Sequence, residues 1–296
     1  MRWEGERQSD NVEDRRGQGG GFGGVGFRRG GIGLGTILLV LLGGWLLGIN
    51  PLEILGLIGG IDGGPAVQAP APSAPGQQGV PPADAGGRFV STVLASTEDA
   101  WTEVFRQGGA RYQPPRLVMF TGATTTACGF GHSAVGPFYC PEDQTVYIDL
   151  DFYRMLQQRF KAPGDFAQAY VVAHEVGHHV QNLLGTMSKV QSQRQRMSER
   201  QYNQLSVRLE LQADCYAGIW ARQSQQAKGW LEKGDVEEGL NAASQIGDDT
   251  MQKREQGTVV PDAFTHGSSK QRVHWFRVGM ESRQLSDCDT FARMEP

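Results

Sequence analysis

An uncharged apolar stretch of twenty residues is the feature that most limits how this chain can fold. Residues 31–50 read GIGLGTILLVLLGGWLLGIN. A helix of that length is about 30 Å long, which matches the hydrocarbon thickness of a bilayer. The flanking segments are rich in Gly, Pro and Arg and offer no partner for a helix that is apolar on every side. We therefore predict a transmembrane helix here, in preference to a buried soluble helix or a cleaved signal peptide.

The segments beside this helix differ in composition from the rest of the chain. Of 41 glycines, 24 precede Arg88, and so do 7 of 14 prolines. Residues 1–30 are polar and rich in Gly and Arg, which predicts a disordered arm, and residues 51–87 read as a Pro/Gly/Ala-rich linker. Residues 88–296 have ordinary globular composition and are enough for a folded domain.

The charge beside the helix predicts its orientation. Arg28 and Arg29 lie just before it, whereas no Lys or Arg occurs from residue 32 to residue 87. Basic flanks stay in the cytoplasm. We therefore expect a single-pass protein of the cytoplasmic membrane, with residues 1–30 inside and residues 88–296 outside. The formal net charge of -4 offers no basic surface to a nucleic acid, so no such partner is expected.

The chain has four cysteines, and a domain outside the cytoplasm can form disulfides. Cys128 and Cys140 bracket a short Gly-rich loop, so we expect these two to pair and leave Cys215 with Cys288. The alternative is a zinc site built from cysteine and His132, which the spacing does not favour.

Hydrophobic periodicity in the globular part predicts an α+β fold that is mostly helical with a small sheet. Strands are predicted over residues 116–120 and 144–150. Helices are predicted over residues 89–105, 152–160, 166–184, 193–226, 235–254 and 269–281. Ser268 and Gln271 give the last helix a capping-box pattern.

The predicted helix over residues 166–184 contains HEVGHH. His174 and His178 are four residues apart, so both imidazoles project from one face and can bind one Zn²⁺. Glu175 lies between them in sequence and can serve as the general base for an attacking water. The alternative is an amphipathic helix with surface histidines. The apolar flanks disfavour it, because buried histidines and a carboxylate need a partner.

A second helical segment, RLELQADCYAGIW, offers two carboxylates four residues apart. Glu210 can complete a His₂Glu zinc site, and Asp214 can accept a hydrogen bond from the far nitrogen of a ligand histidine. The alternative is an exposed acidic face, which the surrounding apolar residues disfavour.

The motifs HEVGHHVQ, ELQAD and THGSSKQR resemble the gluzincin zinc metallopeptidases, in which H-E-x-x-H is followed by E-x-x-x-D. With GPFYCPEDQTVYIDLDF, ELQADCYAGIW and CDTF, residues 88–291 are more closely similar to a bacterial family of neutral zinc metallopeptidases. The resemblance implies a zincin-like domain in which His174, His178 and Glu210 bind Zn²⁺ and Glu175 is the general base. It also implies that Asp214 orients a ligand histidine, His174, and that the membrane is a bacterial one.

The same resemblance implies roles for His266 and Arg272 in stabilising the tetrahedral intermediate or holding the site. Gly267 replaces the proline of related membrane proteases, so a helix-capping role for His266 stays open. A surface or supporting role is expected for His179, and structural roles for His132 and His274. Tyr147–Asp149 is expected to be either a peptide-binding edge strand or a core strand.

The expected function is that of a membrane-anchored zinc endopeptidase acting on peptide or protein substrates. One alternative is a zinc-stabilised binding or scaffold protein without turnover, against which an intact Glu175 argues, because a structural zinc site needs no base. The other is a zinc amide hydrolase acting on a non-protein envelope substrate, which shares the same ligands.

Overall fold

The computed structural model describes residues 1–17, 84–132, 136–158, 164–282 and 284–293. The predicted membrane helix at residues 31–50 lies outside these ranges. Within them, no helix has the length and apolar character needed to cross a membrane. The predicted linker ends three residues early, because Asp84 caps the first helix of the domain and accepts a hydrogen bond from the Gly87 amide.

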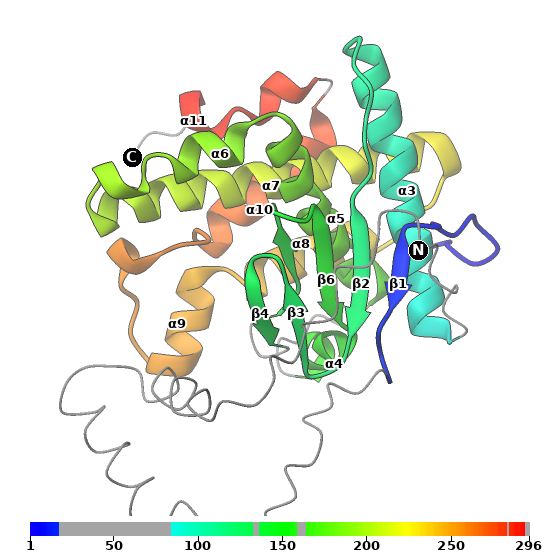
Figure 1. Ribbon diagram of the computed structural model, residues 1–296, viewed down its shortest axis with the longest axis horizontal. Coiled ribbons are helices and arrows are strands. Elements are labelled where there is room, and N and C mark those ends of the chain that lie inside the picture. Colours follow the sequence, from blue (N-terminus) through cyan, green and yellow to red (C-terminus); the bar gives the residue numbers. More distant parts are fainter. Residues whose placement is uncertain (18–83, 133–135, 159–163, 283, 294–296) are drawn as a thin grey trace, which may run out of the picture. The chain divides into compact units, whose positions relative to one another are not determined.

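A four-stranded sheet covers one side of the helices (Figure 1). In spatial order its strands are β1 (Val12–Asp14), β2 (Arg116–Phe120), β6 (Thr145–Asp149) and β5 (Phe138–Cys140). The first three are parallel, and β5 runs antiparallel to β6. A separate hairpin consists of β3 (Ala123–Thr126) and β4 (Gly129–His132). Because β6 is an inner strand, Tyr147–Asp149 belongs to the core, and the two edge strands are β1 and β5.

The predicted mostly helical α+β architecture is confirmed. The helices are α3 (Ala85–Gln107), α4 (Asp151–Gln158), α5 (Asp165–Leu183), α6 (Thr186–Gln191), α7 (Glu199–Lys228), α8 (Asp235–Gln245), α9 (Asp248–Gln256), α10 (Ser269–Glu281) and α11 (Thr290–Arg293). The predicted helix over residues 235–254 is in fact two helices. They are separated at Gly247, where an added Cβ would lie 2.4 Å from the Ser269 amide nitrogen, so a side chain at this break would clash with the start of α10.

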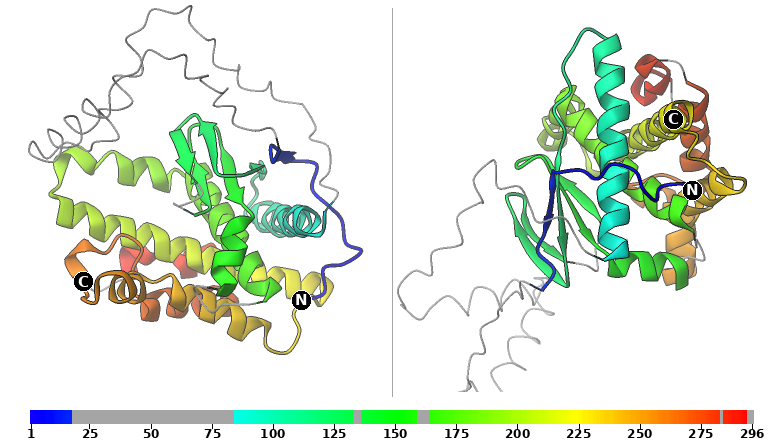
Figure 2. Two further views of the ribbon diagram at one scale, coloured as in Figure 1. Left: turned by 90° about the horizontal axis from the view of Figure 1, so that it is seen from below. Right: turned by 90° about the vertical axis from the view of Figure 1, so that its right-hand side faces the viewer.

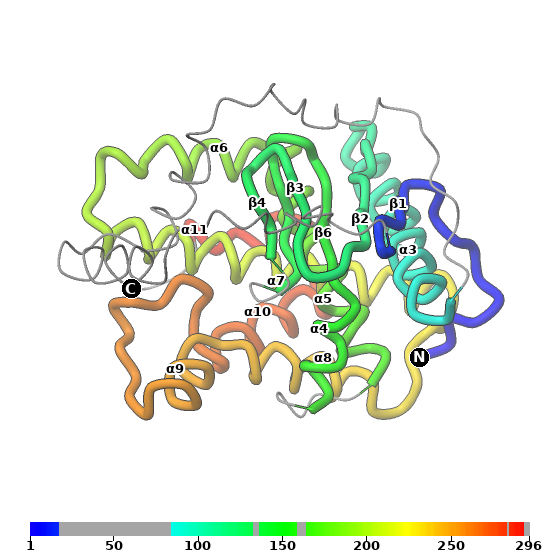
Figure 3. Tube along the Cα trace, turned by 60° about the horizontal axis from the view of Figure 1, so that its bottom comes forward, coloured from blue at the N-terminus to red at the C-terminus, as the bar shows by residue number. Residues whose placement is uncertain are grey.

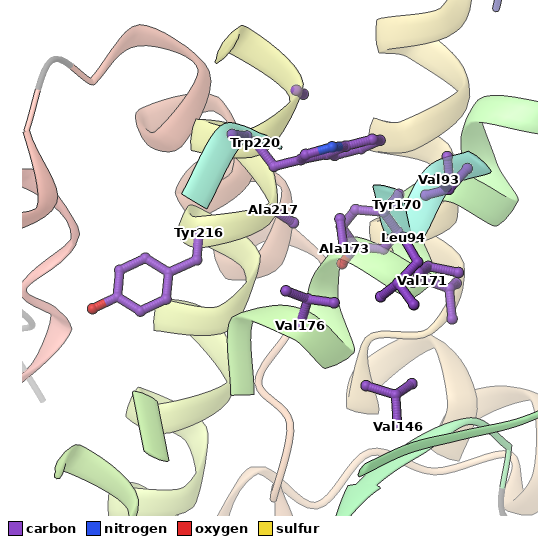
Figure 4. Packing of buried hydrophobic residues seen from close by; sticks show 14 of the residues in the cluster. Val93, Leu94, Val146, Tyr170, Val171, Ala173, Val176, Tyr216, Ala217 and Trp220 are labelled. Atoms are coloured by element: carbon purple, nitrogen blue, oxygen red, sulfur yellow. The ribbon is translucent and has the colours of Figure 1, made fainter. Parts of the chain in front are cut away.

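Helix α5 lies at the centre of the fold, in contact with α3, α7, α8 and the sheet (Figure 3). Most of its side chains are buried, which explains why its sequence is apolar on more than one face. Tyr170, Ala173 and Val176 of α5 face side chains from three directions (Figure 4). These neighbours are Val93 and Leu94 of α3, Val146 of β6, and Ala217 and Trp220 of α7. A rigid central helix fixes the side chains that it presents to the site.

Residues 1–17 belong to this domain, so the prediction of a disordered arm over residues 1–30 is wrong for this part. They run across α3 and end in β1 beside β2 (Figure 2). The Met1 side chain is buried, and its amino group lies 2.8 Å from Asp165 Oδ1 and 3.3 Å from Asp235 Oδ2. Polar and ionic contacts hold this segment where apolar burial alone would not suffice.

Both predicted disulfides are confirmed. Cys128 and Cys140 join the β3–β4 hairpin to β5, and Cys215 and Cys288 join α7 to the turn before α11. His132 lies on the exposed hairpin beside Phe130, away from any cysteine thiol that could bind zinc.

Candidate active site

A close approach of α5 and α7 brings the two sequence motifs together. Gly177 lies against Ala213, and a Cβ added to Gly177 would lie 3.0 Å from the Ala213 carbonyl oxygen. The glycine inside HEVGHH therefore lets the helix backbones pack at short range. His174 and His178 consequently face Glu210 across the contact.

These three side chains form a set of donors suited to one zinc ion. His174 Nε2 lies 3.2 Å from Glu210 Oε2, and His178 Nε2 lies 3.4 Å from Glu210 Oε1. All three donors can lie within 4.8 Å of one another. Two ligands about 2.0–2.1 Å from a tetrahedral ion are themselves about 3.3 Å apart, so the spacing fits Zn²⁺. Three protein ligands leave a fourth position open, as in catalytic zinc sites.

Hydrogen bonds on the far side of each imidazole orient it toward this centre. His174 Nδ1 donates to Asp214 Oδ1 over 2.9 Å, as expected for Asp214. His178 Nδ1 donates to Gln181 Oε1 over 2.9 Å. Both Nε2 atoms are thereby left as the lone-pair donors for a metal, and both rings are held in one orientation.

The charges around His174 favour a cation at this centre. Burial alone lowers the pKa of His174, but the nearby carboxylates of Asp214 and Glu210 outweigh burial and raise it to about 10. Burial opposes ionisation of Glu210, yet His178 and His174 keep its pKa well below the usual value. The carboxylates of Asp214 and Glu210 therefore make the surroundings of the donor set favourable for a bound cation.

Arg272 lies within the structure that supports the site. Its Nε and Nη2 donate to the two carboxylate oxygens of Asp214, each over 2.9 Å, and the side chain is almost completely buried. Tyr170 completes the group by donating its hydroxyl to Asp214 Oδ1 over 2.5 Å. Burial raises the pKa of Asp214, but Arg272 and His174 lower it to about 2. Asp214 therefore stays ionised, and its carboxylate orients His174.

A cavity of about 520 Å³ opens over the three donors. Glu175 lies in its wall beside the histidines, and burial raises the pKa of this carboxyl. The edge strand β5 also lines the cavity through Phe138 and Tyr139, while Phe152, Met155 and Val171 add apolar surface. The cavity therefore combines a candidate base, a polar donor set and an apolar surface beside an edge strand of the sheet.

His266 also lines this cavity, on the loop before α10. The carboxylate of Asp248 holds this loop, because its Oδ2 accepts the backbone N–H groups of Thr265, His266 and Gly267 over 2.8, 2.6 and 2.9 Å. Asp248 Oδ1 lies 3.3 Å from His266 Nδ1. Burial lowers the pKa of His266, but Asp248 and more distant Glu210 outweigh it, so the pKa is raised. Capping of α10 is done by Ser268 instead.

The other histidines lie outside the donor set. His179 is fully buried, so a surface position is wrong for it. It donates from Nε2 to the Gln113 carbonyl and accepts from the Tyr139 hydroxyl at Nδ1, and burial lowers its pKa to about 4. This neutral histidine links α5 to β5, while His274 packs edge-on against Trp275.

Tyr170, Gln181 and Asp248 were not predicted from the sequence. Tyr170 and Gln181 lie four residues before His174 and three after His178, which is the spacing of helical neighbours. That spacing could have identified Gln181 as a partner of His178. No comparable pattern links Asp248 to His266, because different elements carry them.

The family described as “Putative neutral zinc metallopeptidase” matches residues 1–291 of the chain. The Escherichia coli (strain K12) protein “Uncharacterized protein YpfJ” is 50% identical over 296 residues, which are 99% of each chain. The Mycobacterium tuberculosis (strain ATCC 25618 / H37Rv) protein “Uncharacterized protein Rv2575” is 41% identical over 215 residues, 69% of this chain and 72% of that one. No solved structure matches. The family match begins at residue 1, so the similarity is wider than residues 88–291.

Proposed function

Because the chain belongs to this family of neutral zinc metallopeptidases, we propose that it is a zinc-dependent endopeptidase that cleaves peptide or protein substrates. The observation that carries the proposal is the three-donor set of His174, His178 and Glu210 beside Glu175, in a cavity open to solvent. A site that served only to stabilise the fold would favour a fourth protein ligand and would have no use for a buried carboxyl at this position.

The reaction assigns one task to each group. When bound, Zn²⁺ would polarise the scissile carbonyl and lower the pKa of the attacking water. Glu175 accepts the proton of that water and passes it to the leaving amine; its raised pKa suits a group that must carry a proton between two steps.

The remaining residues support this chemistry from the walls of the cavity. His266, which lines the cavity, would stabilise the negative charge that develops on the carbonyl oxygen. Arg272 acts through Asp214 as a positioning residue for His174. The edge strand β5 can pair with an extended peptide, which would align the scissile bond along the donor set.

The decisive experiment compares Glu175→Gln with the wild-type full-length chain in detergent. We expect one zinc per chain in both proteins. We also expect the variant to cleave casein and short peptides about 100-fold more slowly or worse, since general bases contribute about 10²–10⁴-fold. Glu237→Gln, an exposed residue of α8, is the matched control and should behave as wild type.

Unimpaired peptide cleavage by Glu175→Gln would contradict the assigned base. A metal-loaded wild-type protein that hydrolyses cell-wall fragments but no peptide would contradict the peptidase assignment in favour of an envelope amide hydrolase. Metal binding without any hydrolysis would favour a scaffold.

We also propose that the chain is attached to a bacterial cytoplasmic membrane through residues 31–50, with the catalytic domain on the outer face. The support is the uncharged apolar sequence of that stretch together with two disulfides in the domain, which persist in oxidising compartments. Cell fractionation, with and without deletion of residues 31–50, tests the attachment: the wild type should sediment with membranes and the deletion should not.

A further inference from the structure

The described segment that ends at residue 17 and the one that begins at residue 84 meet where they border residues 18–83. Arg16 Nη2 lies 2.5 Å from Asp84 Oδ2 and 2.5 Å from Asp14 Oδ2. Asp84 is also the N-cap of α3. One guanidinium therefore joins the end of β1 to the start of the first helix.

The contacts of residues 1–17 with α3 are specific and partly buried. The Glu98 carboxylate, in the middle of α3, accepts hydrogen bonds from Ser9 Oγ over 2.5 Å, Asn11 Nδ2 over 2.8 Å and Arg7 Nη2 over 3.0 Å. Ser9 also exchanges main-chain and hydroxyl hydrogen bonds with Ser91. Glu98 is 9% exposed, so three partners from one short segment satisfy a largely buried charge.

Strand β1 continues the attachment by pairing with β2. The Leu117 amide donates to the Asn11 carbonyl over 2.9 Å, and the Arg15 amide donates to the Met119 carbonyl over 2.8 Å. Without β1, β2 would be an exposed parallel edge carrying the buried side chains of Leu117 and Met119. Residues 1–17 thus contribute strand β1 to the sheet of the domain and are an integral part of it.

We infer that residues 1–17 and the domain from residue 84 onward lie on the same side of the membrane. A single crossing by residues 31–50 would place about 30 Å of hydrocarbon between Arg16 and Asp84, which are in direct contact. The predicted arrangement, with the N-terminus inside and the domain outside, is incompatible with the β1–β2 pairing. The intervening chain crosses an even number of times or enters the bilayer without crossing it.

Labelling of the full-length chain in intact cells tests this inference. Glu4→Cys and Lys253→Cys each introduce one thiol at an exposed position, one in the N-terminal segment and one on α9. The wild type is the blank, because its four cysteines form disulfides. Each variant is treated with a membrane-impermeant maleimide, before and after the membrane is permeabilised, and the labelled fraction is compared between the two positions.

The two variants should give the same labelled fraction in intact cells, a ratio near one, whichever face the domain occupies. Labelling of one position with protection of the other would overturn the inference. Asp10→Cys, also exposed, repeats the measurement if Glu4→Cys is poorly expressed. Neither result depends on catalysis, so a failure here is distinct from a failure of the proposed peptidase activity.

A stability measurement gives a second, independent test. Ser9→Ala removes the hydrogen bond from the Ser9 hydroxyl to Glu98 and the one that this hydroxyl accepts from the Asn11 amide. The variant should therefore lower the melting temperature of the catalytic domain in the full-length chain. An unchanged melting temperature of that domain would mean that residues 1–17 do not pack on it, and would overturn the inference.

Discussion

A single carboxylate, Asp248, fixes the loop that carries His266, and its replacement tests the role of that histidine. Asp248→Asn keeps the size of the side chain but removes its charge and one acceptor. We expect kcat to fall about 10-fold at unchanged KM, and His266→Ala to lower kcat by about 100-fold, within the range for loss of an oxyanion donor. Steady-state kinetics on a peptide substrate measure both.

The double variant separates positioning from a general structural effect. If Asp248 acts through His266, the kcat of Asp248→Asn/His266→Ala should equal that of His266→Ala, because the second change removes the group that the first misplaces. Losses that multiply would show that Asp248 acts independently. Lys253→Ala changes an exposed residue of α9, the helix that also carries Asp248, and should leave kcat and KM unchanged.

The residues that we propose as zinc donors were predictable from the sequence, whereas most of their supporting partners were not. His174, Glu175 and His178 lie on one helix, where spacing alone determines which side chains share a face. The pairing of Arg272 with Asp214 depends on how α10 packs on α7, which no local pattern encodes. Polar residues that support a site have many possible partners until the packing is known.

At the level of elements, the contact between α7 and α10 holds Arg272 against Asp214, and Gly279 makes that contact possible. A Cβ at Gly279 would lie 1.9 Å from the Cys215 carbonyl oxygen. Gly279→Ala must therefore separate the two helices. We expect a loss of about 1–3 kcal/mol of unfolding free energy, which lowers the melting temperature by about 2–12 °C.

The same variant should bind zinc more weakly, because the shift loosens Arg272 from Asp214 and so loosens His174. Thermal unfolding with and without a chelator measures both effects. Lys270→Ala, exposed on the same helix, is the control. Wild-type stability in Gly279→Ala would mean that the two helices are not packed this closely.

Strand β1 illustrates why some elements escape prediction from sequence. The segment is short and polar, and Val12 is the one buried apolar residue in the strand. Its stabilisation comes from partners distant in sequence, such as Glu98 and β2. Hydrophobic periodicity detects the longer helices, but a three-residue strand held by hydrogen bonds and ion pairs leaves no such pattern.

Acid should weaken the attachment of this segment. The hydrogen bond from Arg16 lowers the pKa of Asp84 to about 2, and the same residue lowers that of Asp14. A carboxyl whose pKa is lower in the folded state stabilises it above the unfolded pKa of about 4, and this stabilisation is lost as the pH falls through the folded pKa. We expect the melting temperature to fall between about pH 4 and about pH 2 for this reason.

Arg16→Gln removes the common partner of the Asp14 and Asp84 carboxyls. In this variant the melting temperature should fall less between about pH 4 and about pH 2. The substitution should also lower the melting temperature at neutral pH, though modestly, because Asp84 is largely exposed and solvent screens the pair. A difference between wild type and Arg16→Gln that is as large at about pH 2 as at neutral pH would contradict the assignment.

At the scale of the whole molecule, the domain that carries the candidate site is assembled from two stretches of sequence separated by the apolar segment. One compact unit comprises Met1–Gly19 and Gln78–Pro296. The family match, which begins at residue 1, spans both stretches. The apolar segment is thus an insertion between the first and second strands of one sheet, and the residues that line the candidate site all come from residues 136–272.

Replacing residues 20–77 with a short Gly/Ser linker should therefore leave a folded, zinc-binding protein that is purified without detergent. Arg16 and Asp84, which border the replaced part of the chain on its two sides, are in contact, so a short linker is long enough. A chain that begins at residue 84 lacks β1 and the partners of Glu98. At about 1 kcal/mol per hydrogen bond, loss of several should lower its melting temperature by about 6–12 °C relative to the linker variant. Equal melting temperatures would mean that residues 1–17 contribute nothing to the domain. A lower value that is restored when a peptide of residues 1–17 is added would show that β1 completes the sheet that supports the site.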